Sequence, residues 1–201
     1  MIEIIAAIAR WFQLTANMTI LGSCVFLAIS GTANSKILEP WVSRVERLFP
    51  WLVILIITGL LAILAVTVAQ ATGDVTKIWQ PDVWVGLLKD TRMGHIWIGR
   101  VSLVLCLLGV VLYLRSTERK SWHYHLCGFF AALPLIAGSL VSHTAADELS
   151  FLAVLPFALH IVMGGIWLGA LPAALFLLYV YYKKENKPNT HDRDAKTLMR
   201  F

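Results

Sequence analysis

Imidazole and thioether side chains occur together in the apolar parts of this 201-residue sequence. Met93 lies two residues before His95, and His160 and Met163 share one face of a helix because they are three residues apart. His143 lies at the end of another apolar stretch. Imidazole and thioether groups suit copper, above all Cu(I), better than they suit zinc or magnesium. We therefore take these five residues as candidate copper ligands, with His143 and His160 at the centre of the site.

Each of these residues also has a purely structural interpretation. A histidine at a helix end can cap carbonyl groups or face lipid headgroups, and a methionine within a membrane helix usually packs against its neighbours. His123 and His125 lie beside Arg119 and Lys120, where an interfacial or solvated role is favoured over metal ligation. His191 lies in the polar C-terminal segment and indicates nothing about a site.

Two arginines interrupt the apolar stretches. Arg10 and Arg100 lie about six residues, or roughly 9 Å, from the same end of their expected helices. Arginine cannot release its proton, so each one needs an anionic or carbonyl partner inside a membrane, or must extend to the surface. We expect Asp147 to be the first partner, because it follows His143 by one helical turn. Two haem propionates or the phosphates of lipid headgroups are the alternative partners.

The composition excludes a water-soluble fold. Hydrophobic residues make up 58% and charged residues 14% of the chain, against roughly 45–50% and about 25% in an average soluble domain. The mean hydropathy is +0.72. Stretches without Asp, Glu, Lys or Arg cover 11–35, 48–73, 101–114, 121–146 and 149–182. A single soluble domain, a disordered chain and a nucleic-acid-binding module are excluded, despite the net charge of +5.

These stretches predict an all-α, polytopic transmembrane helix bundle of about five spans, since one span needs about 20 apolar residues. The expected helices cover residues 4–30, 50–70, 94–114, 123–143 and 153–182. Residues 70–92 contain tryptophans and are predicted to form either a short segment in the headgroup zone or an ordinary ordered loop. Residues 1–182 then form the bundle, and 183–201 form a basic cytoplasmic tail or linker.

The basic residues outside the spans are divided unevenly between the two ends of the predicted bundle. Twelve lie in the first and third connections and after the last helix, whereas three lie in the second connection and none in the fourth. By the positive-inside rule, the N-terminus is periplasmic and the C-terminal tail is cytoplasmic. His95, His143 and His160 then lie toward the same outer level of the membrane.

The start of the last helix decides how close His160 comes to His143. A start at Pro156 places His160 about one turn, or roughly 6 Å, below the surface and close to His143. A start at Phe151 makes the gap about 13 Å, and a shared site is then hard to build.

Small residues point to close helix packing. Gly165 and Gly169 form a GxxxG motif in an apolar helix, which lets a neighbouring helix approach closely. The cysteines lie singly in apolar stretches without CxxC spacing, so we expect buried thiols that form no disulfide.

Several segments resemble the CopD family of bacterial copper-resistance membrane proteins. Ser142-His143-Thr144-Ala145-Ala146, Leu159-His160-Ile161 and Gly165-Ile166-Trp167-Leu168-Gly169-Ala170-Leu171 are similar to that family's paired-histidine region, where a Gly-His-Ala run precedes a helix with a His and a Trp-x-Gly-Gly-Leu motif. Gly94-His95-Ile96-Trp97-Ile98-Gly99-Arg100 resembles the start of an earlier family helix with its arginine, and Arg10-Trp11-Phe12 resembles the first helix.

The resemblance implies a multi-pass protein of the bacterial inner membrane that binds copper and transports or delivers it from the periplasmic side, without catalysis. It also implies two partners, which are a CopC-like periplasmic copper carrier and the lipid of the inner membrane. Three positions depart from the family pattern, since Ser142 and Ala170 replace glycines and Gln13 stands where a histidine is common. Family members usually continue with further helices, so the chain is expected to be short or truncated.

Two other functions are compatible with the same residues. In one, the histidines are axial ligands of a b-type haem, as in the distantly similar HemJ-type membrane proteins, and the protein transfers electrons. In the other, the chain is an accessory subunit of a larger membrane enzyme complex, and its polar residues are structural. The motifs match CopD rather than the HemJ-type proteins, so copper is the first prediction and haem b the alternative cofactor.

Overall fold

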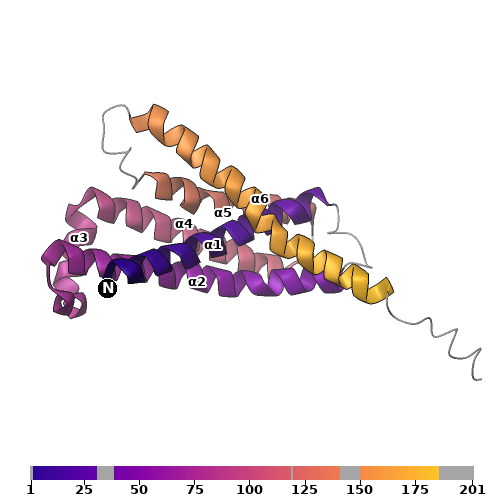
Figure 1. Ribbon diagram of the computed structural model, residues 1–201, viewed down its shortest axis with the longest axis horizontal. Coiled ribbons are helices and arrows are strands. Elements are labelled where there is room, and N and C mark those ends of the chain that lie inside the picture. Colours follow the sequence, from indigo (N-terminus) through magenta and orange to yellow (C-terminus); the bar gives the residue numbers. More distant parts are fainter. Residues whose placement is uncertain (1, 31–38, 119, 141–149, 186–201) are drawn as a thin grey trace, which may run out of the picture.

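The computed structural model describes residues 2–30, 39–118, 120–140 and 150–185, which form α-helices and one short 3₁₀ helix (Figure 1). In chain order the elements are α1 (Ile2–Ile29), α2 (Glu39–Thr72), η2 (Val75–Trp79), α3 (Pro81–Asp90), α4 (Arg92–Ser116), α5 (Ser121–Ser139) and α6 (Ser150–Glu185). These described residues contain no strand. The all-α prediction is therefore confirmed.

Four helices are long and apolar enough to cross a bilayer, namely α1, α2, α4 and the part of α6 from Val154 to Val180. α5 packs against α1 and α4. Its 19 residues extend about 28 Å, close to the roughly 30 Å of a hydrocarbon core. The chain is a multi-pass membrane protein, and α5 corresponds to the fourth expected span, residues 123–143.

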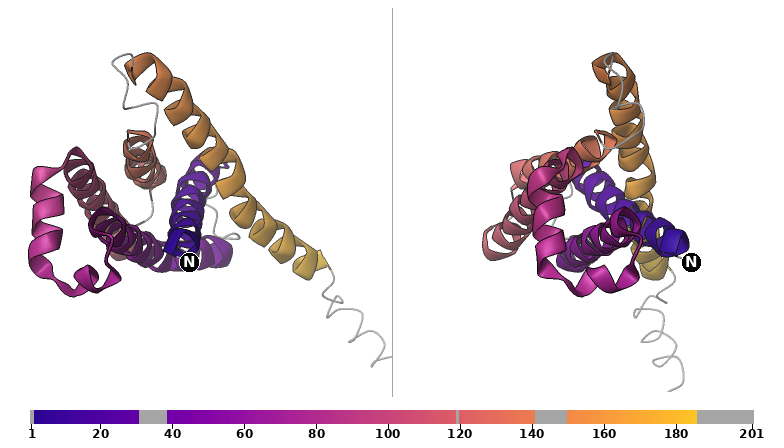
Figure 2. Two further views of the ribbon diagram at one scale, coloured as in Figure 1. Left: turned by 60° about the vertical axis from the view of Figure 1, so that its left-hand side comes forward. Right: turned by 90° about the vertical axis from the view of Figure 1, so that its left-hand side faces the viewer.

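α1 lies at the centre of the bundle, in contact with α2, α5 and α6. α6 crosses α1 obliquely, so that its first turns diverge from the other helices (Figures 1 and 2). The start of α1, the short helix α3 and the start of α6 lie toward one end of the bundle, called the α3 end below. Consecutive long helices thus run in opposite directions, as the predicted topology requires. Which end faces the periplasm stays a prediction.

Glycines allow α1 and α6 to approach each other closely where they cross. A Cβ at Gly169 would overlap the carbonyl oxygen of Met18, and a Cβ at Gly22 would overlap the backbone of Gly169 and Ala170. The Ser23 hydroxyl donates a hydrogen bond to the Gly169 carbonyl at the same contact, with an Oγ–O distance of 3.3 Å. The interpretation of the glycine motif as a packing device is therefore confirmed.

Indole N–H groups join neighbouring helices at other levels. Trp41 Nε1 donates to the carbonyl of Ala173, at 3.2 Å, and links α2 to α6. Trp97 Nε1 donates to the carbonyl of Leu60, at 3.1 Å, and links α4 to α2. A buried indole N–H needs a partner, so these bonds help to fix where each helix sits against the next.

α2 begins earlier than predicted, at Glu39 instead of residue 50. Trp41, Val45 and Phe49 recur at a spacing of four and are buried, so this first part of the helix has an apolar face that packs against the core. Pro50 therefore lies inside the helix.

The connection between α2 and α4 folds as short helices. Asp74 caps η2 by accepting hydrogen bonds from the backbone N–H and the hydroxyl of Thr76, each at 2.8 Å. These two bonds, the backbone one first, lower the pKa of the Asp74 carboxyl. α3 packs on α4, where Gly94 lies against the backbone of Leu87 and Leu88. The expectation of a short folded segment agrees with this structure, and its location in the headgroup zone stays a prediction.

Candidate functional site

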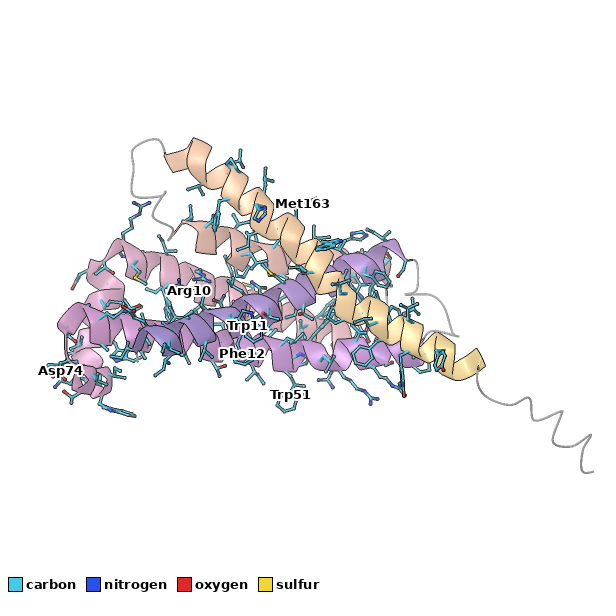
Figure 3. The ribbon with its side chains drawn as sticks, viewed as in Figure 1. Arg10, Trp11, Phe12, Trp51, Asp74 and Met163 are labelled. Atoms are coloured by element: carbon cyan, nitrogen blue, oxygen red, sulfur yellow. The ribbon has the colours of Figure 1, made fainter. Side chains whose placement is uncertain are left out.

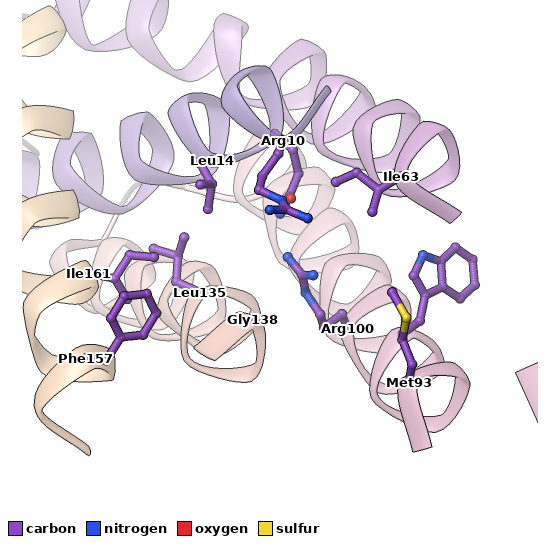
Figure 4. A pocket seen from close by; sticks show the side chains of 11 residues that line it. Arg10, Leu14, Ile63, Met93, Arg100, Leu135, Gly138, Phe157 and Ile161 are labelled. Carbon is purple, nitrogen blue, oxygen red and sulfur yellow. The ribbon is translucent and has the colours of Figure 1, made fainter. Parts of the chain in front are cut away.

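A cavity of about 380 Å³ opens between α1, α2, α4, α5 and α6 near the α3 end (Figure 4). Its lining combines two guanidiniums, an amide, a thioether and an indole with aliphatic and aromatic walls. The lining residues are Arg10, Gln13, Leu14, Ile63, Met93, Trp97, Arg100, Leu135, Gly138, Phe157 and Ile161. The cavity thus brings charged groups and apolar walls together within the helix bundle.

Single faces of the surrounding helices line this cavity. Residues three or four positions apart share a helix face, and this spacing holds for α1 (Arg10, Gln13, Leu14), α4 (Met93, Trp97, Arg100) and α6 (Phe157, Ile161). α6 touches α1 at Gly169 and diverges from it toward the α3 end (Figure 2). This divergence leaves space beside Phe157 and Ile161.

Arg10 and Arg100 point toward each other across the cavity (Figure 4). Neither guanidinium forms a hydrogen bond or an ion pair with another described residue, and the Nε atom of Arg100 is buried. The guanidinium of Arg100 lies beside Gly138, where a Cβ would stand 3.4 Å from its Nη2 atom. Arg10 is exposed and Arg100 is half-buried. Two like charges that face each other repel, so the space between them favours an anion.

Two buried amides on α1 adjoin the arginines. Gln13 is 1% exposed and lines the cavity, and Asn17 is 0% exposed and lies one turn further along. The Nε2 atom of Gln13 and both polar atoms of Asn17 have no hydrogen-bond partner among the described residues. An unsatisfied buried polar group costs about 1–3 kcal/mol. The sequence interpretation missed both amides as site residues, although Arg10, Gln13 and Asn17 recur at helical spacing.

The structure places the predicted copper ligands in different surroundings. Met93 lines the cavity, whereas His95 is exposed in the first turn of α4. His160 and Met163 are exposed on α6 and do not line the cavity, and Met163 is 63% exposed (Figure 3). His143 lies outside the described residues. Within the described part of the chain, no three His, Cys, Asp or Glu side chains gather as a metal site, so the copper ligand set stays a prediction.

The start of α6 differs from the one that would bring two histidines together. α6 begins at Ser150 and contains Pro156 in its interior, so the alternative of a helix start at Pro156 is wrong. His160 lies about 15 Å along the helix from Ser150, which is the arrangement in which a site shared with His143 is hard to build. Asp147, the predicted partner of the arginines, lies outside the described residues, and that pairing stays a prediction.

His123 has a structural role that the sequence interpretation did not identify. Its side chain is 2% exposed, so the expectation of a solvated role is wrong for this histidine, and the interfacial alternative stays a prediction. The backbone N–H of Lys120 donates to its Nδ1 atom at 3.3 Å, and its ring packs edge-on against Tyr113 and Trp122. His125 is exposed, as expected.

Haem b, the alternative cofactor, does not fit the described residues that line this cavity. The facing arginines have the chemistry to bind two propionates. Axial ligation also needs side chains such as histidine or methionine, and among the described residues that line the cavity Met93 alone is of that type.

The sequence matches the family model described as "Copper resistance protein D-like, N-terminal domain" over residues 1–152. It is also 29% identical over 153 residues to the copper transport protein CutJ of Bacillus subtilis (strain 168). That match covers 74% of this chain and 28% of CutJ, so the chain spans less than a third of the length of this relative. No solved structure shows a significant match. The matched region contains all cavity residues except those of α6.

Proposed function

This chain belongs to the copper resistance protein D-like family, and from that membership we propose that it binds copper at the periplasmic side of the bacterial inner membrane and passes it inward. The observation that carries the proposal is the family match over residues 1–152. A relative that is 29% identical is named a copper transport protein. The proposed role is transport or delivery, and no catalytic step is included.

His160 and Met163 are the proposed first ligands, together with His143. His160 and Met163 follow one another at a spacing of three on α6, and both side chains are exposed. An imidazole and a thioether on one helix face offer the soft ligand set that suits Cu(I).

Met93 and His95 are the proposed ligands at the start of α4. Met93 presents its thioether to the cavity, and His95 is exposed two residues later. Arg10 and Arg100 line the same cavity, and their charges oppose a bare cation there. Copper beside Met93 therefore requires an anion that compensates the two arginines.

The proposed partners follow from the same family membership. Membrane lipid surrounds the helices, and a CopC-like periplasmic carrier is the proposed source of copper at the outer face. A larger membrane complex remains the alternative setting, in which the chain would be an accessory subunit.

Metal and pigment analysis of the purified chain tests this proposal. The protein is isolated in detergent, incubated with Cu(I) under a reductant, freed of excess metal and analysed for copper per chain and for its visible spectrum. We expect copper to be retained and no haem absorption. His160→Ala should lower the retained copper. His125→Ala is the matched control, because His125 is exposed near the start of α5, and α5 begins at the end of the bundle opposite to the start of α6 (Figure 1).

Two outcomes contradict the proposal. In the first, the unmodified chain retains no more copper than a variant that lacks His143, His160 and Met163. These residues would then not bind copper. In the second, the purified chain shows a Soret band that disappears in the Arg100→Leu variant. This outcome supports b-haem binding and electron transfer instead.

A further inference from the structure

The facing guanidiniums of Arg10 and Arg100, with the amide of Gln13, form an anion site. We propose that these three side chains bind a phosphate group, supplied by the headgroup of an anionic phospholipid at the α3 end. The proposal rests on the geometry of the cavity and its depth along α1, and it does not depend on copper.

The first support is the missing counter-charge. Two guanidiniums face one cavity, and no described side chain forms an ion pair or a hydrogen bond with either. The buried Nε of Arg100 and the buried Nε2 of Gln13 are donors without an acceptor among the described residues. A phosphate offers several acceptor oxygens and negative charge, and guanidinium binds it through paired hydrogen bonds.

The depth of the arginines suits a lipid headgroup. α1 has 28 residues and is about 42 Å long, so a centred helix extends about 6 Å beyond each side of a roughly 30 Å hydrocarbon core. Arg10 lies about 12 Å from the start of α1 and thus about 6 Å inside the boundary of that core. An arginine side chain can extend across such a depth toward the headgroups.

The walls of the cavity favour a lipid over a free ion. Leu14, Ile63 and Leu135 line it together with Phe157 and Ile161 of α6. A bare phosphate ion would leave these side chains without contact, whereas the glycerol and first acyl carbons of a lipid pack against them. The diverging start of α6 forms one side of this space (Figure 2).

Gly138 supplies a way to block the site without removing charge. A Cβ at this position would stand 3.4 Å from Nη2 and 3.6 Å from Cζ of Arg100. A leucine there would occupy the space beside the guanidinium, while both arginines remain.

The test is native mass spectrometry of the full chain in detergent, titrated with phosphatidylglycerol or phosphatidylcholine. We expect the unmodified chain to retain one phosphatidylglycerol more tightly than phosphatidylcholine. Arg10→Gln and Arg100→Gln should each weaken this retention by about tenfold, the effect of losing a charge-assisted hydrogen bond. Gly138→Leu should give a similar loss. Arg92→Gln is the control, because Arg92 is exposed at the start of α4 and does not line the cavity.

Further measurements distinguish a lipid headgroup from a free phosphate ion as the source of the anion. Inorganic phosphate that binds the lipid-free chain with the same dependence on both arginines supports the phosphate site with the free ion as its source. Equal retention of phosphatidylglycerol by all variants, or no preference over phosphatidylcholine without phosphate binding, overturns the proposal. Phosphatidylglycerol binding that appears only in Asp147→Asn also overturns it, because Asp147 would then be the counter-ion. If the Arg100→Gln variant does not accumulate in cells, the retention of phosphatidylglycerol by the Arg100→Lys and Gly138→Leu variants tests the proposal instead.

Discussion

Gly169 of α6 lies with its Cα against the backbone carbonyl of Met18 in α1. The approach is so close that a Cβ at Gly169 would overlap the carbonyl oxygen. This contact fixes the level at which α6 crosses α1. Toward the α3 end the two helices separate, and the arginine-lined cavity opens beside that separation (Figures 2 and 4).

A larger residue at this crossing should separate the helices. We expect Gly169→Val to destabilise the fold by about 1–3 kcal/mol or more, because the added methyl groups meet backbone that cannot move aside. The measurement is the thermal unfolding midpoint of the detergent-purified protein. Gly164→Val on the same helix is the matched control, since a Cβ at Gly164 has no neighbour within 4 Å among the described residues. Equal midpoints for the two variants would contradict the packing role.

The histidines should differ in their importance for copper. We expect His143→Ala and His160→Ala to weaken copper binding and copper-dependent growth, because loss of one ligand removes a bond that the others cannot replace. His125→Ala and His191→Ala should have little effect. His123 is unsuitable as a control because it is buried against Tyr113 and Trp122. Similar losses at all positions would mean that the histidines form no localised site.

The orientation in the membrane is testable with reporter fusions. The uneven distribution of basic residues predicts cytoplasmic signals for fusions at Arg44, Arg119 and Lys187, and periplasmic signals at Thr76 and Glu148. A fusion with a phosphatase and one with a fluorescent protein at each position give complementary readings. A periplasmic signal at Lys187 would reverse the assignment of the α3 end to the periplasm.

One hydrogen bond between helices should contribute measurably to stability. The Tyr124 hydroxyl donates to Oε1 of Glu46 at 2.6 Å and joins α5 to α2. A hydrogen bond to a charged group contributes about 1.5–3 kcal/mol, so Tyr124→Phe should lower the unfolding midpoint. Tyr113→Phe is the control, because Tyr113 is 47% exposed. No difference between the two variants would mean that water or lipid replaces the bond without cost.

The cap of η2 should respond to pH. Hydrogen bonds from the backbone and the side chain of Thr76 lower the pKa of Asp74. The carboxylate cap is therefore fully present above the ordinary pKa of an aspartate and is lost as the pH falls through the lowered value. Thr76→Val removes the hydroxyl donor and should move the pKa of Asp74 upward, which an NMR titration of the carboxyl carbon measures. An unchanged titration would show that the hydroxyl has no influence.

The sequence alone determined the class of the protein and the course of its chain. Apolar stretches of membrane-spanning length define helices wherever no water is available to the backbone, and the distribution of basic residues predicts their orientation. The segments around His143, His160 and Arg100 also indicated the family to which the chain belongs. These properties depend on residues that are near one another along the chain.

Only the tertiary structure decided which side chains meet. Arg10 and Arg100 were predicted at one depth, but their facing positions depend on the rotation of α1 and α4 about their axes. Met163 was placed on the exposed side of α6 and Gly169 on the packed side. α6 has large exposed hydrophobic side chains along most of its length, and in a helix that is apolar all round periodicity does not show which face is buried. The rotation of such a helix is set by contacts with distant residues, here the approach of Gly169 to Met18.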